Sequence, residues 1–281
     1  MAASLNPYLS KCDEEFDAGK STQYRMTIQF ALGGLSYALL DTKGNRLIVL
    51  ECYQSDLLSD SNDLFHTLER SLETKGLNNK SFQSVICIID ERLNTLIPEA
   101  LYKPEDNEKY LGFGFTLPSD YVMMTDHLPC KAVNLYAIPQ NLQSRILAKW
   151  PNAEITHSTS VFINSVPKTE NPTAFVNVRN RDFDLVIIRQ GRLFFFNNFK
   201  FNTKDDFAYF LVFALEQNGL SGQDTPVCFT GLIRPASEII DLCGRYIKDI
   251  RFVEDPNELQ ISQDIKEVPY QFYHIHYQAI K

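Results

Sequence analysis

The sequence predicts an α/β protein made of two similar lobes, and an ordered repeat is the main reason. The segments from about Tyr24 to Tyr102 and from about Thr173 to Arg251 each show three strands, a capped helix, a lone strand and another helix. The lone strand of the first copy (SVICIID) is almost wholly apolar, which is typical of a strand covered on both faces of a parallel or mixed sheet. Two copies of one unit predict two lobes with a cleft between them.

The first copy opens with a predicted hairpin of three strands, at 26–30, 35–40 and 46–53. Turn-forming residues at 41–45 (DTKGN) separate the second strand from the third. Ser61 is expected to cap the following helix, and Gly76 to end it. The lone strand is then expected at 84–90.

The second copy repeats this order with clearer helix signals. Strands are expected at 173–178, 183–189 and 193–199, and the lone strand at 226–230. Thr203 and Asp206 form a capping-box pattern at the start of the helix. One apolar stripe at helical spacing follows, at Phe207, Phe210, Leu211, Ala214 and Leu215. The next helix is expected to start at Pro235 and to end at Gly244.

The domain organisation predicted from these copies has three parts. We expect an N-terminal arm at 1–20, a first lobe at 21–167 with an inserted segment at about 103–137, and a second lobe at 168–281. The polar, proline-ended stretch 168–172 (KTENP) is the expected linker. Between the copies the pattern predicts strands at 121–124, 131–137 and 153–156, a helix that starts at Pro139 and a further helix at 161–166.

The composition excludes some classes of partner. The net charge of −8 disfavours nucleic acid and anionic membrane surfaces, because both carry negative charge. No stretch approaches the roughly 18 apolar residues that span a bilayer, so we expect no membrane insertion. The first residues lack the pattern of a signal peptide and the six cysteines are scattered, so the predicted localisation is cytoplasmic.

The expected partner is another protein, and a homodimer through an unpaired sheet edge is a further expectation. Two aromatic-rich stretches, 110–115 and 270–277, fit either partner contact or core packing. His274 and His276 would share a face on a strand, but no third ligand lies nearby, so no metal site is predicted.

Three short segments carry a resemblance to a known family: 35–41 (LSYALLD), 96–102 (LIPEALY) and 227–231 (VCFTG). The chain resembles a family of uncharacterised bacterial proteins, a domain of unknown function with an actin-like ATPase fold. This resemblance implies two ribonuclease H-like lobes, each with a mixed five-stranded type of sheet flanked by helices. It covers nearly all of the chain beyond the first twenty residues.

In the actin-like ATPase superfamily, phosphate binds at a turn between the first two strands of each lobe. That turn carries an Asp, which holds the metal, and a Gly, which lets backbone N–H groups approach the phosphate. Here the first turn (30–35, FALGGL) keeps Gly33 and Gly34 and lacks the acid. The second turn (178–183, VRNRDF) has no glycine; Arg179 and Arg181 either contact phosphate directly or are exposed hairpin residues.

Two further positions follow from the resemblance and from the strand order. Thr230 and Gly231 stand where this superfamily grips adenosine, although a strand-to-helix turn often needs a glycine anyway. Asp90 ends the first lone strand, at the edge of the sheet where α/β proteins place ligands. It could act as a general base or hold a metal-bound water, or it could cap a helix.

These residues leave three functions open. The first is a non-catalytic binding or scaffold protein on a degenerate actin-like ATPase fold, with no cofactor. The second is an ATP-binding kinase or ATPase that uses ATP and magnesium in the cleft between the lobes. The third is an unrelated α/β enzyme whose residues cannot be paired from sequence. The missing acid favours the first, because phosphoryl transfer depends on a positioned metal.

Overall fold

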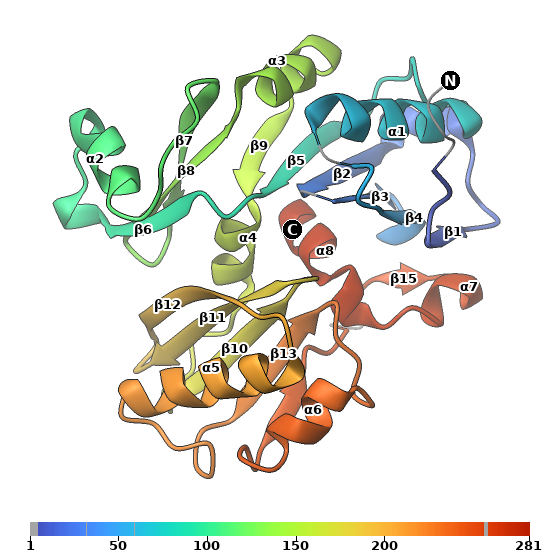
Figure 1. The fold of residues 1–281 in the computed structure, drawn as a ribbon. Coiled ribbons are helices and arrows are strands. Elements are labelled where there is room, and N and C mark those ends of the chain that lie inside the picture. The colour runs from blue at the N-terminus through green and yellow to red at the C-terminus, as the bar shows by residue number, and fades with distance from the viewer. Residues whose placement is uncertain (1–4, 32, 59, 256–257) are drawn as a thin grey trace. The chain divides into compact units, whose positions relative to one another are not determined.

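The fold was analysed in a computed structural model, which describes residues 5–31, 33–58, 60–255 and 258–281. The chain divides into two compact units (Figure 1). Unit 1 takes the described residues of Met1–Val161, Pro256–Val268 and His276–Lys281. Unit 2 takes Phe162–Asp255 and Pro269–Ile275. No helix in the described part of the chain is both long and apolar enough to cross a membrane.

Unit 1 is built on a mixed sheet whose strands run in the order β1-β4-β3-β2-β5-β9, with β15 also paired to β4. The neighbours in β1-β4-β3-β2 are antiparallel, whereas β2-β5 and β5-β9 are parallel. The strands are β1 (Leu9–Cys12), β2 (Tyr24–Ala31), β3 (Gly34–Asp41), β4 (Arg46–Gln54), β5 (Ser84–Asp90), β9 (Glu154–His157) and β15 (Gln260–Ile261).

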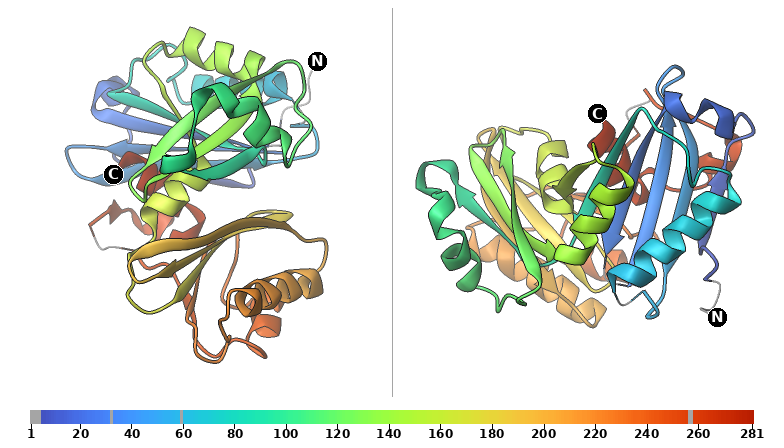
Figure 2. Two further views of the ribbon diagram at one scale, coloured as in Figure 1. Left: turned by 90° about the vertical axis from the view of Figure 1, so that its left-hand side faces the viewer. Right: turned by 90° about the horizontal axis from the view of Figure 1, so that it is seen from above.

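One face of this sheet is covered by α1 (Ser61–Thr74) and α3 (Gln140–Lys149), and Figure 2 shows α1 running along the strands. The Asp60 carboxylate caps α1 by accepting the N–H groups of the second and third helical residues. The predicted cap, Ser61, is therefore wrong by one position; it is the first helical residue. The unit 1 core lies under these helices and contains Tyr24, Met26, Ile28, Phe30, Leu64, Phe65, Leu68 and Leu72.

A small second sheet is inserted after β5. Its strands are β6 (Asn94–Pro98), β8 (Ala132–Pro139) and β7 (Tyr121–Leu128), in that spatial order. With α2 (Asn107–Gly112) it encloses a separate core of Ile97, Leu111, Leu135 and Ala137. The sequence predicted a helix directly after the lone strand of the first copy. That prediction is wrong, because Asn94–Pro98 pairs with β8 as a strand and the equivalent helix, α3, comes only after the insertion.

Unit 2 repeats the sheet of unit 1. Its strands run β12-β11-β10-β13-β14, which corresponds to β4-β3-β2-β5-β9. They are β10 (Thr173–Val178), β11 (Asp182–Arg189), β12 (Arg192–Lys200), β13 (Val227–Gly231) and β14 (Ile250–Phe252). The matching order confirms the duplication of an α/β unit with a mixed sheet and flanking helices.

Two helices, α5 (Lys204–Gln217) and α6 (Glu238–Cys243), pack on one face of the unit 2 sheet. The predicted capping box is confirmed, because Thr203 and Asp206 cap each other's backbone N–H groups. Helix α6 begins three residues after the predicted start at Pro235, because the side chain of Ser237 caps it. The unit 2 core lies between sheet and helices and includes Val176, Phe183, Phe207, Leu211, Leu215 and Phe229.

The two histidines of the C-terminal segment lie on a helix. His274 and His276 do not lie on a strand; they open the helix α8 (His274–Ile280), where residues two apart point in different directions. In unit 1, the ring nitrogens of His276 lie 2.8 Å from Thr27 Oγ1 and 2.8 Å from Ser36 Oγ. Burial lowers the pKa of His276 to about 4, so the ring is neutral at pH 7. Among the described residues, no group of three His, Cys, Asp or Glu could hold a metal ion.

The predicted domain boundary at 167/168 assigned every later residue to the second lobe. Packing instead places residues 258–268 and 276–281 in unit 1. Strand β15 extends the unit 1 sheet by pairing with Arg46 and Leu47 of β4, and Arg25 donates a hydrogen bond to the backbone oxygen of Ile280. In the predicted N-terminal arm, Leu9–Cys12 forms β1 along the same strand β4.

Candidate functional site

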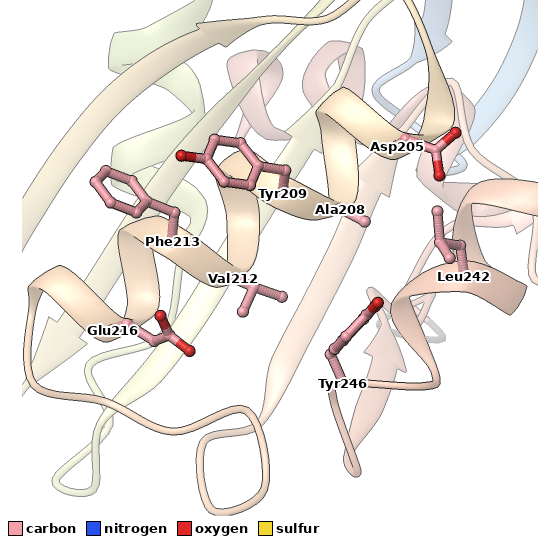
Figure 3. Close-up of a pocket in the computed structure, with 8 residues that line it drawn as sticks. All are labelled: Asp205, Ala208, Tyr209, Val212, Phe213, Glu216, Leu242 and Tyr246. Carbon is pink, nitrogen blue, oxygen red and sulfur yellow. The ribbon is translucent and has the colours of Figure 1, made fainter.

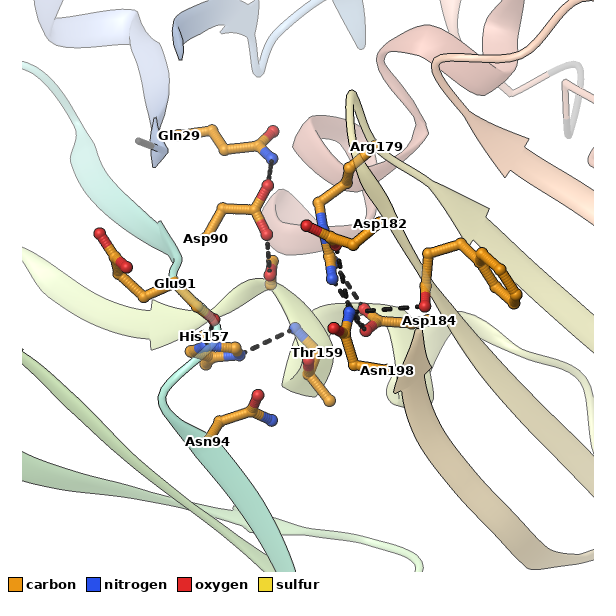
Figure 4. A network of polar contacts seen from close by, with 12 residues as sticks. Gln29, Asp90, Glu91, Asn94, His157, Thr159, Arg179, Asp182, Asp184 and Asn198 are labelled. Atoms are coloured by element: carbon orange, nitrogen blue, oxygen red, sulfur yellow. Dashed lines mark hydrogen bonds and ion pairs between the residues drawn. The ribbon is translucent and has the colours of Figure 1, made fainter. Parts of the chain in front are cut away.

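The predicted carboxylate, Asp90, lies at the carboxyl end of β5, where β2 and β9 also end (Figure 4). Its Oδ2 atom accepts a hydrogen bond from Gln29 Nε2 at 2.9 Å, and its Oδ1 atom accepts one from Ser158 Oγ at 2.6 Å. Gln29 belongs to β2, and Ser158 is the buried first residue of α4 (Ser158–Ser165). Asp90 thus ties two strands to a helix, and the described residues that follow it lead into the strand β6 and not into a helix that it could cap.

The next residue, Glu91, is an acid whose pKa is raised. Burial raises its pKa to about 7, and the nearby charge of Asp90 adds to the shift. The side chain is half-buried. A carboxyl group with a pKa near neutrality can exchange a proton at physiological pH, which is the property required of a general acid or base.

His157 holds the backbone of this edge in place. Its Nδ1 atom accepts the backbone N–H of Thr159 at 3.1 Å, so we assign the proton to Nε2, which donates to the carbonyl oxygen of Glu91 at 2.8 Å. The ring is almost fully buried. Asp126 accepts the backbone N–H of His157 at 2.9 Å and the hydroxyl of Thr156 at 2.9 Å. The sequence alone did not reveal these contacts of His157. Through its bond to the backbone of Glu91, His157 belongs to the network around Asp90.

The substitution Glu91→Gln is expected to stabilise the protein at pH 8 more than at pH 5. The pKa of Glu91 is higher in the folded state than in the unfolded chain, so its contribution to stability is lost as the pH rises through 7. Glutamine removes this loss. Because Glu91 is half-buried, we expect a gain of about 1–2 kcal/mol at pH 8, measured by urea unfolding at both pH values. An equal effect at pH 5 and pH 8 would contradict the raised pKa.

The glycine turn of unit 1 lies at the same end of the sheet, because Ala31 pairs with both Gly34 and Asp90. Gly33 adopts φ +76°, a left-handed conformation that favours glycine. Its N–H group donates to the carbonyl oxygen of Leu58 at 2.9 Å, so this donor is already used within the protein. Position 32 of the predicted turn lies outside the described residues.

In unit 2, the two arginines of the equivalent turn behave differently. The Arg179 guanidinium donates to Asp184 through Nη1 at 2.7 Å and Nη2 at 2.9 Å, and to Asp182 through Nε at 2.6 Å. Asn198 donates to the same two carboxylates. Arg181 is exposed. A phosphate would have to compete with two carboxylates for Arg179.

The turn after β13 is covered by the segment η4 (Tyr270–Phe272) of the same unit. Thr230 is fully buried and its hydroxyl donates to the backbone oxygen of Gln271 at 3.3 Å. The Gln271 amide in turn donates to the backbone oxygen of Ile233 at 3.1 Å. Gly231 has φ +85°, and a Cβ atom there would lie 2.2 Å from the oxygen of Val178. This turn is therefore tightly packed by protein atoms.

Within each unit, the structure brings the predicted residues to one end of the sheet. In unit 1 these are Asp90, Gly33 and Gly34; in unit 2, Val178 pairs with Gly231, which puts the Arg179 turn beside Thr230. Sequence reasoning missed the other residues of these hydrogen-bond networks, which are Gln29, Ser158, His157, Asp126, Leu58, Asp182, Asp184, Asn198 and Gln271.

Comparisons with known proteins agree with this architecture. Residues 13–250 match the family described as "Protein of unknown function (DUF3822)". The search of curated proteins gave no match. A solved structure from Bacteroides thetaiotaomicron VPI-5482, described as a protein with actin-like ATPase fold and unknown function, is similar with a TM-score of 0.75 and 17% identity. It covers 85% of this chain and 93% of that chain.

A second solved structure, the PilM–PilN type IV pilus biogenesis complex, contains a chain similar to this one with a TM-score of 0.63 and 11% identity. It covers 91% of this chain and 97% of that chain. At these identities the similarity shows the fold alone. The fold is the actin-like ATPase fold, so the predicted fold class is confirmed.

Proposed function

The chain belongs to the DUF3822 family, and we propose that this member is a cytoplasmic binding or scaffold protein that does not hydrolyse nucleotide. The observation that carries this proposal is the state of the predicted nucleotide-contacting groups. Asp90 is hydrogen-bonded by Gln29 and Ser158, the Gly33 N–H is bonded to Leu58, and Arg179 is neutralised by Asp184 and Asp182. A phosphate would have to displace protein partners from the Gly33 N–H and from Arg179, and a metal-bound water would have to displace the donors of Asp90.

The lack of an available acid at both phosphate turns supports the same proposal. The first turn reads FALGGL, and the acids of the second turn region, Asp182 and Asp184, are bound to Arg179. A magnesium ion needs negatively charged oxygen ligands that are not already paired with a cation. Phosphoryl transfer depends on that ion. The residues at these turns do not fit a metal-bound triphosphate.

The proposed partner is another protein. The net charge of −8 opposes nucleic acid, as noted for the sequence. The similar chain in the PilM–PilN type IV pilus biogenesis complex supports the proposal, because it shows this fold inside a complex named for two components. We extend only the general role, protein binding, to this chain.

The second candidate function is ATP binding with kinase or ATPase activity, and the raised pKa of Glu91 is the observation that favours it. Its pKa near 7 and its position beside Asp90, at the carboxyl edge of the sheet, suit a general base. In this alternative, ATP and magnesium would bind at the Gly33–Gly34 turn of unit 1, and Asp90 or Glu91 would activate the attacking group.

Calorimetric titration with ATP and magnesium separates the two functions. We expect no binding heat up to millimolar ATP, and no phosphate release, for the wild-type protein. A micromolar dissociation constant would contradict the proposal if Asp90→Ala abolished it. The control Asp41→Ala removes a carboxylate from a hairpin turn, where it accepts the N–H of Lys43, so this variant should keep any such binding.

A further inference from the structure

Helix α5 carries apolar side chains on its solvent-exposed face as well as on the face that packs against the sheet. Nine consecutive residues, 207–215 (FAYFLVFAL), carry apolar or aromatic side chains. A helix packed on one face of a sheet normally has an apolar stripe and a polar outer face. Here Tyr209 is 61% exposed and Phe213 is 42% exposed. Their rings stack at 5.7 Å between centroids, with 14° between the planes.

These side chains border a groove on the surface of unit 2 (Figure 3). Tyr209, Val212 and Phe213 of α5 line it, together with Leu242 of α6 and Tyr246 just beyond α6. The groove encloses about 350 Å³. Exposed apolar area of this kind is costly in water, and on soluble proteins it commonly marks a site of interaction.

The duplicated fold supplies an internal comparison. Helix α1 holds the same place in unit 1 and also has 14 residues. The two helices bury the same core-facing positions. In α1 these residues are Leu64, Phe65, Leu68, Ser71 and Leu72. At the same helix positions, α5 carries Phe207, Ala208, Leu211, Ala214 and Leu215.

The outer faces of the two helices differ. At the positions of Tyr209, Val212 and Phe213, helix α1 carries His66, Glu69 and Arg70. Helix α1 therefore packs on its sheet with a polar outer face. Because the fold does not need apolar residues at these outer positions, their presence in α5 indicates a face that another molecule covers.

The charges around the groove restrict what can cover it. Asp205 lies in the first turn of α5 and Glu216 in its last turn, and both line the groove. The two positions are eleven residues apart, which corresponds to about 16 Å along the helix axis at 1.5 Å per residue. Among the described residues that line the groove, none carries a positive charge. Basic groups at both ends of an apolar segment would complement this surface.

We propose that the groove between α5 and α6 docks an amphipathic helix of a partner protein, about three turns long, with an apolar face and with Lys or Arg near both ends. This inference builds on the proposed binding function. Val212 and Phe213 lie three and four residues after Tyr209, so they form a ridge along α5 against which a second helix can pack. Exposed aromatic anchors in a groove are typical of helix recognition.

The test selects peptides from a phage-displayed library of random 16-residue sequences against the full-length protein. We expect the selected peptides to carry apolar residues at i, i+3, i+4 and i+7, flanked by Lys or Arg. Each synthetic peptide is then titrated by fluorescence anisotropy against variants of the groove. The triple variant Y209H/V212E/F213R copies the outer face of α1, and the variant D205K/E216K reverses the charge at both ends.

Both variants are expected to weaken peptide binding at least tenfold. The matched control is Glu73→Lys, at the position in α1 that corresponds to Glu216, and it should leave binding unchanged. Far-UV circular dichroism checks the folding of each variant. If the triple variant fails to fold, the peptide affinity of D205K/E216K tests the proposal.

The proposal is overturned if no peptide is enriched, if enriched peptides are acidic, or if they bind the variants as tightly as the wild-type protein. It is also overturned if light scattering shows a dimer that the triple variant abolishes, because a second copy would then cover the groove. ATP binding in the calorimetric titration would contradict the proposed function but would not change the peptide-binding measurements. The failure of the proposed function and the failure of this inference can therefore be told apart.

Discussion

Replacing Arg179 by methionine is expected to lower the free energy of unfolding by about 3–5 kcal/mol. The guanidinium forms a bidentate pair with Asp184, whose side chain is only 1% exposed, and a further bond to Asp182. Methionine keeps much of the apolar stem but leaves both carboxylates without their cation. A buried charge that loses its partner is costly, because protein atoms have replaced the water that would solvate it.

Urea unfolding followed by circular dichroism measures this loss, and amide hydrogen exchange in β10 and β11 locates it in unit 2. The matched control is Arg181→Met in the same turn. Arg181 is exposed, so its replacement should change stability by no more than about 0.5 kcal/mol. If both variants cost the same, the ion pair with Asp184 contributes nothing and Arg179 would remain open to another ligand.

The second large effect is expected for Gly231→Ala, with a loss of about 3 kcal/mol or more in the free energy of unfolding. The residue has φ +85°, which alanine tolerates poorly. The added Cβ would also lie 2.2 Å from the oxygen of Val178 and 2.7 Å from Asn177 Oδ1. These neighbours belong to β10, so the turn can relieve the clash only by moving away from the strand that it packs against.

The control for this prediction is Gly219→Ala. Gly219 has φ +70°, but an added Cβ would meet no atom within 4 Å. Its replacement should therefore lower the free energy of unfolding only by the cost of placing alanine in this backbone conformation, about 1–2 kcal/mol. Thermal unfolding of the two variants separates backbone conformation from close packing. Equal losses in both would show that the contact with Val178 relaxes without cost.

The sequence predicted the strands well because their signals are local. The lone strand 84–90 and the strand 173–178 coincide with β5 and β10. Both are runs of mostly apolar residues flanked by polar or turn-forming residues, and such runs can be recognised without knowledge of distant partners. The order of these strands was also sufficient to predict the duplicated fold.

The inserted sheet was predicted only in part. The strands expected at 121–124 and 131–137 correspond to β7 and β8, whereas β6 was missed because it depends on a distant partner. Thr95 and Ile97 of β6 pair with Leu135 and Val133 of β8, about forty residues later in the chain. A short segment such as 94–98 carries no periodicity that separates a strand from a helix. The helix expected at this point appears only after the insertion, as α3.

The candidate site shows the same division between local and distant information. The sequence placed Asp90 at a strand end, but its partner Ser158 is 68 positions away and could not be identified. For Arg179 a local signal was present, since Asp182 and Asp184 follow at three and five residues. Asn198 joins them only through the register of β11 and β12, which pairs it with Asp184.

The surface of α5 was predictable in part. The spacing of Phe207, Leu211 and Leu215 correctly indicated a buried stripe. The same run also contains Tyr209 and Phe213, outside that stripe, which one packed face does not require. An uninterrupted apolar run in a helix at the protein surface is therefore a sequence signal for a docking face, once the buried positions are known.

The split composition of unit 1 has a consequence for the order of events during translation. Strand β15 and the end of α8 leave the ribosome after the 94 residues of Phe162–Asp255, which belong to unit 2. At about 5–20 residues per second, the nascent first sheet waits on the order of 5–20 s for its last strand and for the ring of His276. The sheet of unit 2, whose last strand is β14, can thus form on the emerging chain before unit 1 is complete, although unit 1 begins first.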